Sequence, residues 1–284
     1  MTTVNERRYL EWYAANLYSG AGAAVELGCW LGSLTRAVCR GLQQNRALRE
    51  IGESGAGLEV FDRFEWDSTM ESWVAGTSLA GRTPEGGDYE AVFREQVGEY
   101  LPMLRIHRAD LANERWTGGP IELLVVDAMK TMPTARGICR NFYPALLPER
   151  GYLIHQDFLH FFHGWIHVTT YVLRDFFEWT YEVPDSDMVV FRCVRRPPEY
   201  QFPEDLSGFS DSEITAAFDW VEEHVSPAKR HTIAAARAMS YIHRGKDEIG
   251  KRMVREALNG RYAGSASFQA LKAFTGRFGI VNWD

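Results

Sequence analysis

The segment from Glu26 to Ser33 combines residue types that could hold a small ligand. An apolar run ends in the carboxylate of Glu26, two glycines follow at positions 28 and 32, and a segment rich in Ser and Thr begins at Ser33. This order predicts a buried strand, a tight turn and a helix whose first N–H groups face a ligand. A carboxylate at that point would repel a pyrophosphate, whereas it would attract a ligand that carries an amine or another cationic group.

The spacing of these glycines differs from the dinucleotide-binding fingerprint. The pattern G-x-G-x-x-G requires three glycines. Here Gly28 fills the first position and Trp30 the middle one, while the third glycine is missing and Leu34 occupies a neighbouring position. We therefore expect Trp30 to pack beside a ligand other than a dinucleotide.

Carboxylates recur at the ends of five predicted strands. In a doubly wound sheet, ligands bind outside the carboxyl ends of the strands. Asp62 is suited to accept hydrogen bonds from a ribose diol, and Asp110 could receive an adenine amino group. Any one of these residues could instead be a helix N-cap or a solvated loop residue, but their common placement favours a site. The five are Glu26, Asp62, Asp110, Asp127 and Asp157.

Histidines crowd the segment around Asp157, at positions 155, 160, 163 and 167. His163 and His167 would share a helix face at a spacing that can bind zinc, yet no H-E-x-x-H pattern exists. The stronger hypothesis is that His155 or His160 lies beside Asp157 and acts as a general base without a metal. For the others we expect partly buried rings that are hydrogen-bonded to the backbone.

The bulk composition indicates a soluble α/β protein of the cytoplasm. The 284 residues are 45% hydrophobic and carry a net charge of −7, which argues against nucleic acid as an obligatory partner. The N-terminal residues lack the profile of a signal peptide, and no apolar run is long enough for a membrane span. The cysteines, at positions 29, 39, 139 and 193, form no C-x-x-C pair, so we expect a reducing cytosol.

The elements that must position these residues alternate between strands and helices. Alternation of this kind predicts an α/β fold with a doubly wound, mostly parallel seven-stranded sheet, and the late hairpin adds an antiparallel strand. The predicted strands are 23–28, 58–62, 103–107, 121–127, 152–155, 179–183 and 187–195. Helices are predicted at about 33–47 and 161–178, and a turn at 52–57. Between the second and third of them, the polar and Gly-rich segment 64–87 is a candidate lid.

The double proline at 197–198 marks a predicted domain boundary. Residues 1–198 would form the ligand-binding domain, with a lead-in helix at 4–18, and residues 199–284 a C-terminal helical extension. We expect this extension to pack on the core or to form a dimer contact, which makes a homodimer a reasonable expectation. Its predicted helices span 212–224, 227–244, 247–259 and 265–274.

Several of these motifs resemble the class I S-adenosylmethionine-dependent methyltransferases. Residues 26–32 look like their first motif, E/D-x-G-x-x-x-G, and residues 60–65 (VFDRFE) like the F-D-x-F-E segment of the macrocin O-methyltransferase-like group. Residues 127–130 (DAMK) are similar to the D-x-x-K segment of metal-dependent O-methyltransferases. Residues 147–157 follow the L-x-P-G-G-x-h-h-x-x-D pattern of both groups. The resemblance covers roughly residues 20–195 and departs from the pattern at Gln156 and Phe158.

The resemblance implies a set of site residues. It places Asp127 and Asp157 around Mg²⁺, with Lys130 as the base that takes the proton of the substrate hydroxyl, and it gives catalytic candidates Lys130, His155 and Asp157. The residues implied at S-adenosylmethionine are Glu26, Gly28, Trp30, Gly32, Ser33, Asp62, Arg63, Asp110 and Asp127.

The function that the motifs imply is O-methylation of a small molecule, a sugar or another hydroxyl of a secondary metabolite, possibly assisted by Mg²⁺. The reaction is an in-line displacement in which the protein mainly positions donor and acceptor. Two alternatives stay open. One is a nicotinamide-dependent oxidoreductase on the same sheet, and the other is a cofactor-binding module without turnover that acts through its helical tail.

Overall fold

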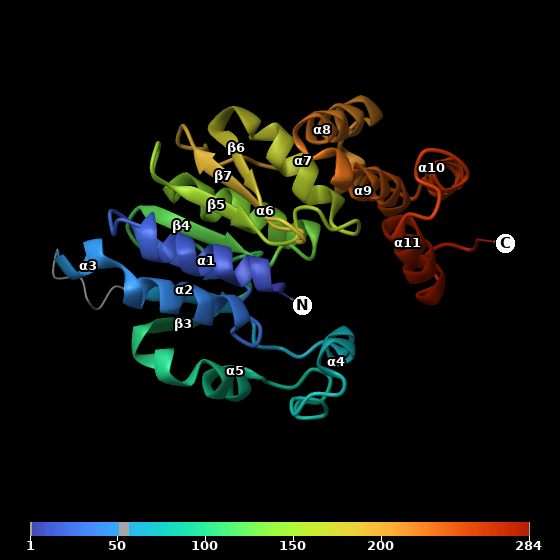
Figure 1. Cartoon of the computed structure of the whole chain (residues 1–284). Helices are drawn as coiled ribbons and strands as arrows, with labels where there is room; N and C mark the ends of the chain where they lie inside the picture. Colours follow the sequence, from blue (N-terminus) through green and yellow to red (C-terminus); the bar gives the residue numbers. More distant parts are fainter. Residues whose placement is uncertain (1, 51–56, 284) are drawn as a thin grey trace.

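A twisted seven-stranded sheet forms the centre of the protein (Figure 1). The computed structural model describes residues 2–50 and 57–283. The strand order is β3-β2-β1-β4-β5-β7-β6. Strands β1 to β5 are parallel, and β7 runs antiparallel to both of its neighbours. The strands are β1 Ala23–Leu27, β2 Leu58–Asp62, β3 Leu104–Arg108, β4 Ile121–Val126, β5 Tyr152–His155, β6 Phe177–Glu182 and β7 Val189–Cys193.

Strand β4 shows why the sheet is covered on both faces. All of its six residues are buried, and successive side chains of a strand point to opposite faces. Leu123 and Val125 therefore pack in one core cluster, while Leu124 and Val126 pack in the other. An apolar run without polar alternation is typical of such a central strand.

One face of the sheet is covered by helices α1 Val4–Asn16, α2 Ser33–Gln44 and α5 Glu90–Val97. Helices α6 Met132–Asn141 and α7 Gly164–Val172 cover the other face. In α1, Thr3 and Glu6 form a capping box, in which each side chain bonds to the other's backbone N–H. Helices α1 and α2 pack so closely that a Cβ at Gly41 would lie 2.3 Å from the Glu11 carbonyl oxygen.

The candidate lid is an ordered excursion from the sheet. Its base is closed by the bridge between Glu65 and Asp88 and by two backbone hydrogen bonds, in which the Trp66 N–H donates to the Gly87 carbonyl and the Gly86 N–H donates to the Trp66 carbonyl. The Trp66 side chain is buried at this base, whereas Trp73, on the short helix α4 (Ser68–Val74), is about half exposed (51%). The lid thus has an anchored tryptophan and an exposed one.

The C-terminal segment is helical, as predicted. Helices α8 Asp211–His224 and α9 Arg230–His243 contribute Phe218 and Ile233 to the same core as α7. Helices α10 Asp247–Asn259 and α11 Ala266–Arg277 form a smaller core with α9. Short 3₁₀ helices span Gly98–Met103, Tyr143–Ala145, Arg174–Phe176, Leu206–Gly208 and Pro227–Lys229.

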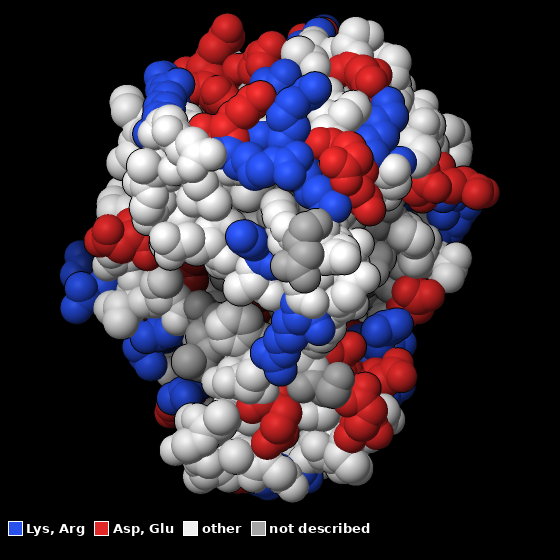
Figure 2. Space-filling view, turned by 90° about the vertical axis from the view of Figure 1, so that its right-hand side faces the viewer, with Lys and Arg blue, Asp and Glu red and all other residues white. Residues whose placement is uncertain are grey.

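In the upper part of the face shown in Figure 2, which is the right-hand side of Figure 1, Lys and Arg side chains are interspersed with Asp and Glu side chains. The C-terminal helices lie along that side. None of the helices that the structure describes is long and apolar enough to cross a membrane.

Two predicted helices end earlier than their sequence patterns suggest. Helix α2 ends at Gln44, because the side-chain amide of Asn45 donates to the carbonyls of Ala14 (2.8 Å) and Tyr18 (2.7 Å). The next residues form a separate short helix, α3 (Arg46–Glu50). The helix expected at 161–178 spans only 164–172, since Phe177 already pairs with β7. A turn expected at 52–57 falls mostly outside the described residues.

Candidate active site

The glycine turn at the end of β1 brings three residues with left-handed backbone together. The φ angles are +83° at Gly28, +41° at Trp30 and +80° at Gly32, a region that is costly for residues with a Cβ. Gly28 donates its N–H to the Phe61 carbonyl of β2 (2.8 Å). A Cβ on Gly28 would lie 2.8 Å from the Asp127 carbonyl oxygen, so glycine is needed for the turn to pass against the end of β4.

Two kinds of hydrogen-bond donor at this turn could face a ligand: the first backbone N–H groups of α2 and the indole N–H of Trp30. Helix α2 begins at Ser33 directly after the turn, so its first N–H groups lie at the same edge of the sheet. The indole Nε1 of Trp30 is buried and has no hydrogen-bond partner among the described residues. A buried donor without a partner is uncommon in a folded protein, and a ligand that accepts a hydrogen bond would satisfy it.

Glu26 is placed beneath the turn and not at its surface. Its side chain is buried (1% exposed) and accepts a hydrogen bond from Thr35 Oγ1 (2.7 Å). Burial raises the pKa of Glu26 to about 8, which outweighs the lowering effect of the Thr35 hydrogen bond. Glu26 is therefore protonated at neutral pH, so it supports the turn from below as a neutral acid.

Asp62 joins the glycine turn to the base of the lid. Its Oδ2 accepts the backbone N–H of Trp30 (3.0 Å), while its Oδ1 accepts the N–H of Phe64 (2.9 Å) and the hydroxyl of Tyr89 (2.7 Å). A carboxylate has about four acceptor positions, so one position remains for a ligand on the Oδ2 side. The predicted contact of Asp62 with a ribose would use this position.

Asp110, Arg63 and Ser33, which are also implied at the cofactor, are exposed or partly exposed. Asp110 is exposed and accepts the N–H of Ala112 (3.1 Å) and the side-chain amide of Asn113 (2.9 Å), as in a capping turn. Arg63 is exposed beside Asp62. Ser33 is covered by the first residues of the chain, since its hydroxyl lies 2.6 Å from that of Thr2.

Asp127, Lys130 and Asp157 form an ion cluster at the ends of β4 and β5. Asp127 follows β4 and donates its backbone N–H to Leu27 of β1 (2.8 Å), which places the cluster next to the glycine turn. The Lys130 ammonium contacts Asp127 Oδ1 (2.7 Å) and Asp157 Oδ2. Half of the Lys130 side-chain surface is open to solvent (49%). A bound substrate could therefore reach it.

Gln156 completes this cluster. Oriented with its nitrogen toward the carboxylates, its side-chain amide donates to Asp157 Oδ1 (2.7 Å) and to Asp127 Oδ1 (3.0 Å). The side chain is buried. Both carboxylates thus share two N–H donors, the ammonium of Lys130 and the amide of Gln156.

The charges of the cluster shift the pKa values of its members. Burial raises the pKa of Asp157, but the ammonium of Lys130 outweighs it and the pKa is lowered. Burial and the charge of Asp157 raise the pKa of Asp127 against the effect of Lys130. Burial lowers the pKa of Lys130, yet both carboxylates together raise it above its ordinary value. Lys130 is therefore a cation in this state.

These residues do not fit the predicted Mg²⁺. The ion requires near-octahedral coordination by oxygen at 2.0–2.1 Å, whereas the two carboxylates are bridged by nitrogen donors. Over residues 2–50 and 57–283, no group of at least three His, Cys, Asp or Glu side chains could hold a metal. Phe158 supplies no ligand either, because its hydrocarbon side chain has no oxygen; it is buried in the core.

The structure separates the four histidines. His155 faces the core, where its Nε2 lies 2.8 Å from the Tyr143 hydroxyl and burial lowers its pKa to about 3. His167 is also fully buried. His163 lies nearest to the cluster, with Nδ1 3.7 Å from Asp157 Oδ2, and its ring is 4.9 Å from that of His160. The imidazoles near Asp157 are therefore those of His163 and His160, so of the two expected residues His160 lies on this side and His155 is directed elsewhere.

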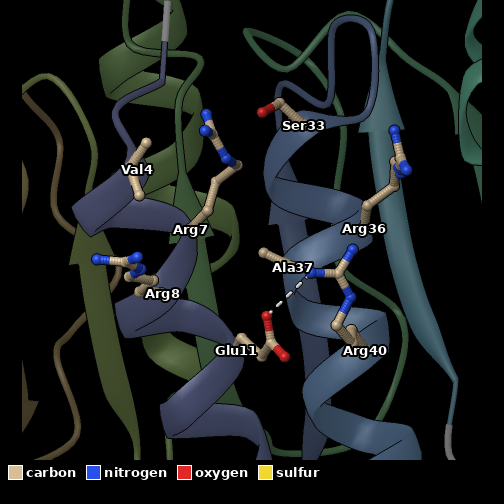
Figure 3. Close-up of a pocket in the computed structure, with 8 residues that line it drawn as sticks. All are labelled: Val4, Arg7, Arg8, Glu11, Ser33, Arg36, Ala37 and Arg40. Carbon is tan, nitrogen blue, oxygen red and sulfur yellow. Dashed lines mark hydrogen bonds and ion pairs between the residues drawn. The ribbon is translucent and has the colours of Figure 1, made fainter.

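A separate groove lies between α1 and α2 (Figure 3). It has a volume of about 470 Å³ and is lined by four arginines together with Glu11, which pairs with Arg40 (3.2 Å). Of the implied site residues, it includes only Ser33. The arginines are Arg7, Arg8, Arg36 and Arg40.

Three contributors to the site were not assigned a role from the sequence. Tyr89 orients Asp62, Gln156 binds both carboxylates of the cluster, and His163 lies beside Asp157. Gln156 had a visible signal, because the sequence departs from the resembled pattern at this position. Tyr89 had none, since it lies 27 positions from Asp62 in the chain and reaches it only through the closure of the lid base.

The chain was compared with protein-family models, curated proteins and solved structures. No protein-family model matches the sequence, and no curated protein matches it. Among solved structures, the O-methyltransferase NovP is similar at 15% identity and a TM-score of 0.49, covering 68% of this chain and 81% of that one. The CcbJ methyltransferase from Streptomyces caelestis is similar at 10% identity and a TM-score of 0.34, covering 54% and 52%. The sheet itself confirms the predicted α/β fold, with a mostly parallel seven-stranded sheet and C-terminal helices.

Proposed function

We propose that this protein is an S-adenosylmethionine-dependent O-methyltransferase that acts on a hydroxyl of a small molecule. The observation that carries the proposal is the meeting of two half-sites at one edge of the sheet. The glycine turn with Asp62 forms the first half, and the cluster of Lys130 with its two carboxylates forms the second. They are joined by the hydrogen bond from Asp127 N to Leu27 O (2.8 Å).

The first half-site suits the methyl donor. Asp62 keeps one acceptor position for a ribose hydroxyl, the first N–H groups of α2 suit a carboxylate, and Trp30 offers a buried indole N–H without a partner in the described chain. When bound, the donor supplies an electrophilic methyl carbon, to which the acceptor oxygen bonds as the C–S bond breaks and its electron pair stays on sulfur. The protein's task is to hold the two reactants in line.

In the second half-site, Asp157 receives the proton of the acceptor hydroxyl. An alcohol oxygen becomes strongly acidic while it gains the methyl group, so a carboxylate is a sufficient base. Lys130 keeps Asp157 ionised through its direct contact, and the open part of its surface lets it hydrogen-bond to the acceptor oxygen. The role of base that the resemblance implies for Lys130 requires a neutral amine. The two carboxylates stabilise the charged ammonium instead and so oppose this role.

The strand order speaks against the nicotinamide alternative. Dinucleotide-binding sheets have the order 3-2-1-4-5-6 with parallel strands. Here β7 is inserted antiparallel between β5 and β6, and the turn at Gly28 lacks the third glycine.

Calorimetric titration with S-adenosylhomocysteine and with NADH tests the proposal. Micromolar binding of S-adenosylhomocysteine alone supports the methyl-donor site, and binding of NADH alone overturns it. Asp62→Asn should weaken binding of S-adenosylhomocysteine by about 1.5–3 kcal/mol, as expected for lost hydrogen bonds to a charged acceptor. Asp219→Asn, at an exposed ion pair on α8, is the matched control.

A turnover assay separates the enzyme from a binding module. The wild type is incubated with labelled S-adenosylmethionine and a panel of glycosides and phenols, and the transfer of label is followed. Binding without transfer to any acceptor would favour the module without turnover. Asp157→Asn should abolish transfer while leaving the affinity for S-adenosylhomocysteine within about threefold, a change below 1 kcal/mol.

A further inference from the structure

The ammonium of Lys130 occupies the point between Asp127 and Asp157 at which a bridging cation would bind. It donates to Asp127 Oδ1 (2.7 Å) and also contacts Asp157 Oδ2. Lysine carries a compact point charge with three N–H donors. It can therefore serve two carboxylates at once and still donate one hydrogen bond to a third oxygen.

The local backbone directs Lys130 into this position. Its N–H bonds to the Ala128 carbonyl (2.7 Å) in a tight turn after β4, and Thr131 then caps α6 through its side chain. The lysine is thus held at the junction between strand and helix, where its side chain can turn back over the ends of β4 and β5. The turn after β4 and the start of α6 place Lys130 between the two carboxylates, so no bound ligand is needed to hold it there.

Gln156 occupies the second position at which an oxygen ligand would be expected. When its side-chain amide is oriented with the nitrogen toward the carboxylates, this nitrogen lies 2.7 Å from Asp157 Oδ1 and 3.0 Å from Asp127 Oδ1, whereas the opposite orientation sets the amide oxygen against the carboxylate oxygens without a hydrogen bond. An N–H group cannot coordinate a metal, and it holds carboxylate oxygens that a metal would need. The buried Gln156 and the ammonium of Lys130 therefore replace a divalent ion with two nitrogen donors.

We propose that Lys130 is the resident cation of the acceptor site and that the protein neither binds nor requires a divalent metal there. A divalent ion would have to displace the ammonium or approach it closely, and like charges at such a distance repel. This inference deepens the proposed methyl transfer, since it assigns to Lys130 the neutralising role that a metal would have beside the acceptor oxygen. It concerns the ion content of the site, which can be measured without turnover.

The first experiment measures Mn²⁺ binding to the wild type by electron paramagnetic resonance and by calorimetry, with and without S-adenosylhomocysteine. We expect no site with a dissociation constant below about 1 mM. A site in the micromolar range that Asp157→Asn removes would overturn the proposal.

The second experiment removes the cation. Lys130→Met leaves two carboxylates without a charge partner, so we expect it to gain Mn²⁺ binding at least tenfold tighter than that of the wild type. Adding Asp157→Asn to this variant should remove the gain. Lys130→Arg keeps the charge and should bind no metal, and Lys251→Met, at an ion pair on α10, should behave as the wild type.

Circular dichroism and thermal unfolding establish that each variant is folded before metal binding is scored. If folded Lys130→Met fails to gain Mn²⁺ binding, Lys130 is not what excludes the metal, and the proposal is overturned. If no acceptor is ever methylated, the proposed function fails, whereas the result of the metal titrations stands. Once turnover is found, it should persist in EDTA, and a loss of activity that Mg²⁺ restores would contradict the proposal.

Discussion

The hydroxyl of Tyr89 donates a 2.7 Å hydrogen bond to Asp62 Oδ1 across the base of the lid. This contact ties the residue that precedes α5 to the last residue of β2. Trp66 packs edge-on against the Tyr89 ring, with 5.9 Å between the ring centroids. The base of the lid is therefore connected to the proposed donor site through Tyr89, which contacts both Trp66 and Asp62.

Tyr89→Phe should weaken the affinity for S-adenosylhomocysteine by about 1 kcal/mol, or roughly fivefold, because Asp62 loses a neutral donor that orients it. Titration calorimetry measures the change. Tyr200→Phe, at a partly exposed tyrosine far along the chain, should leave the affinity unchanged. An unaltered affinity in Tyr89→Phe would show that Asp62 needs no support from the lid.

Glu26 makes the stability of the protein depend on pH. Its pKa is raised from 4.5 to about 8 in the folded state, mainly by burial. The stabilisation is therefore fully present below pH 4.5 and is lost as the pH rises through 8. Between these values the free energy of unfolding should fall by up to about 1.4 kcal/mol per pH unit.

Glu26→Gln should flatten this dependence, because the amide keeps an acceptor for Thr35 but does not ionise. Urea unfolding at several pH values between 5 and 8.5 measures the slope for both proteins. Equal slopes would mean that Glu26 is not the group responsible.

The glycine turn provides a test of close packing. Gly28 and Gly81 both have positive φ (+83° and +69°), but a Cβ on Gly28 would meet the Asp127 carbonyl at 2.8 Å, whereas one on Gly81 has nothing within 4 Å. Gly81→Ala should cost about 1 kcal/mol of stability from backbone strain alone.

Gly28→Ala should cost about 1–3 kcal/mol more, because the turn must move away from β4. Denaturant unfolding compares the two variants. If both variants lose a similar amount of unfolding free energy, the end of β4 can move to accommodate the added Cβ. That result would contradict a rigid turn at Gly28.

The two tryptophans of the lid should differ in their effect on stability. Trp66→Ala removes a side chain that is 3% exposed, and we expect a loss of about 3–5 kcal/mol. Trp73→Ala removes one that is 51% exposed and should change stability by less than about 0.5 kcal/mol. Thermal and urea unfolding decide this, and equal losses would contradict the anchored base described above.

Much of the sheet could be predicted because the strands are short apolar runs that end in polar residues. All five parallel strands were located to within about two residues, which is the usual uncertainty of such boundaries. The antiparallel strand was also expected, from the turn between two β-rich segments. The break at Asn45 was not, because it depends on tertiary hydrogen bonds to Ala14 and Tyr18.

The direction of side chains limited the prediction of the site. Leu153 and His155 are two residues apart on β5, so their side chains share a face. Since that face packs on α6 and α7, alternation alone indicates that His155 points into the core. The placement of Lys130 between two carboxylates could not be read from D-x-x-K, because the same spacing serves a metal site as well as a salt bridge.

The left-handed Trp30 gives the protein an optical probe of its own. Its backbone N–H is fixed to Asp62 (3.0 Å), while its indole N–H is buried without a partner in the described chain. A ligand that reaches this indole changes the polarity and hydrogen bonding of a fluorophore. The difference in emission between the wild type and Trp30→Phe would then report occupancy of the turn in real time, without a label and before any acceptor is known.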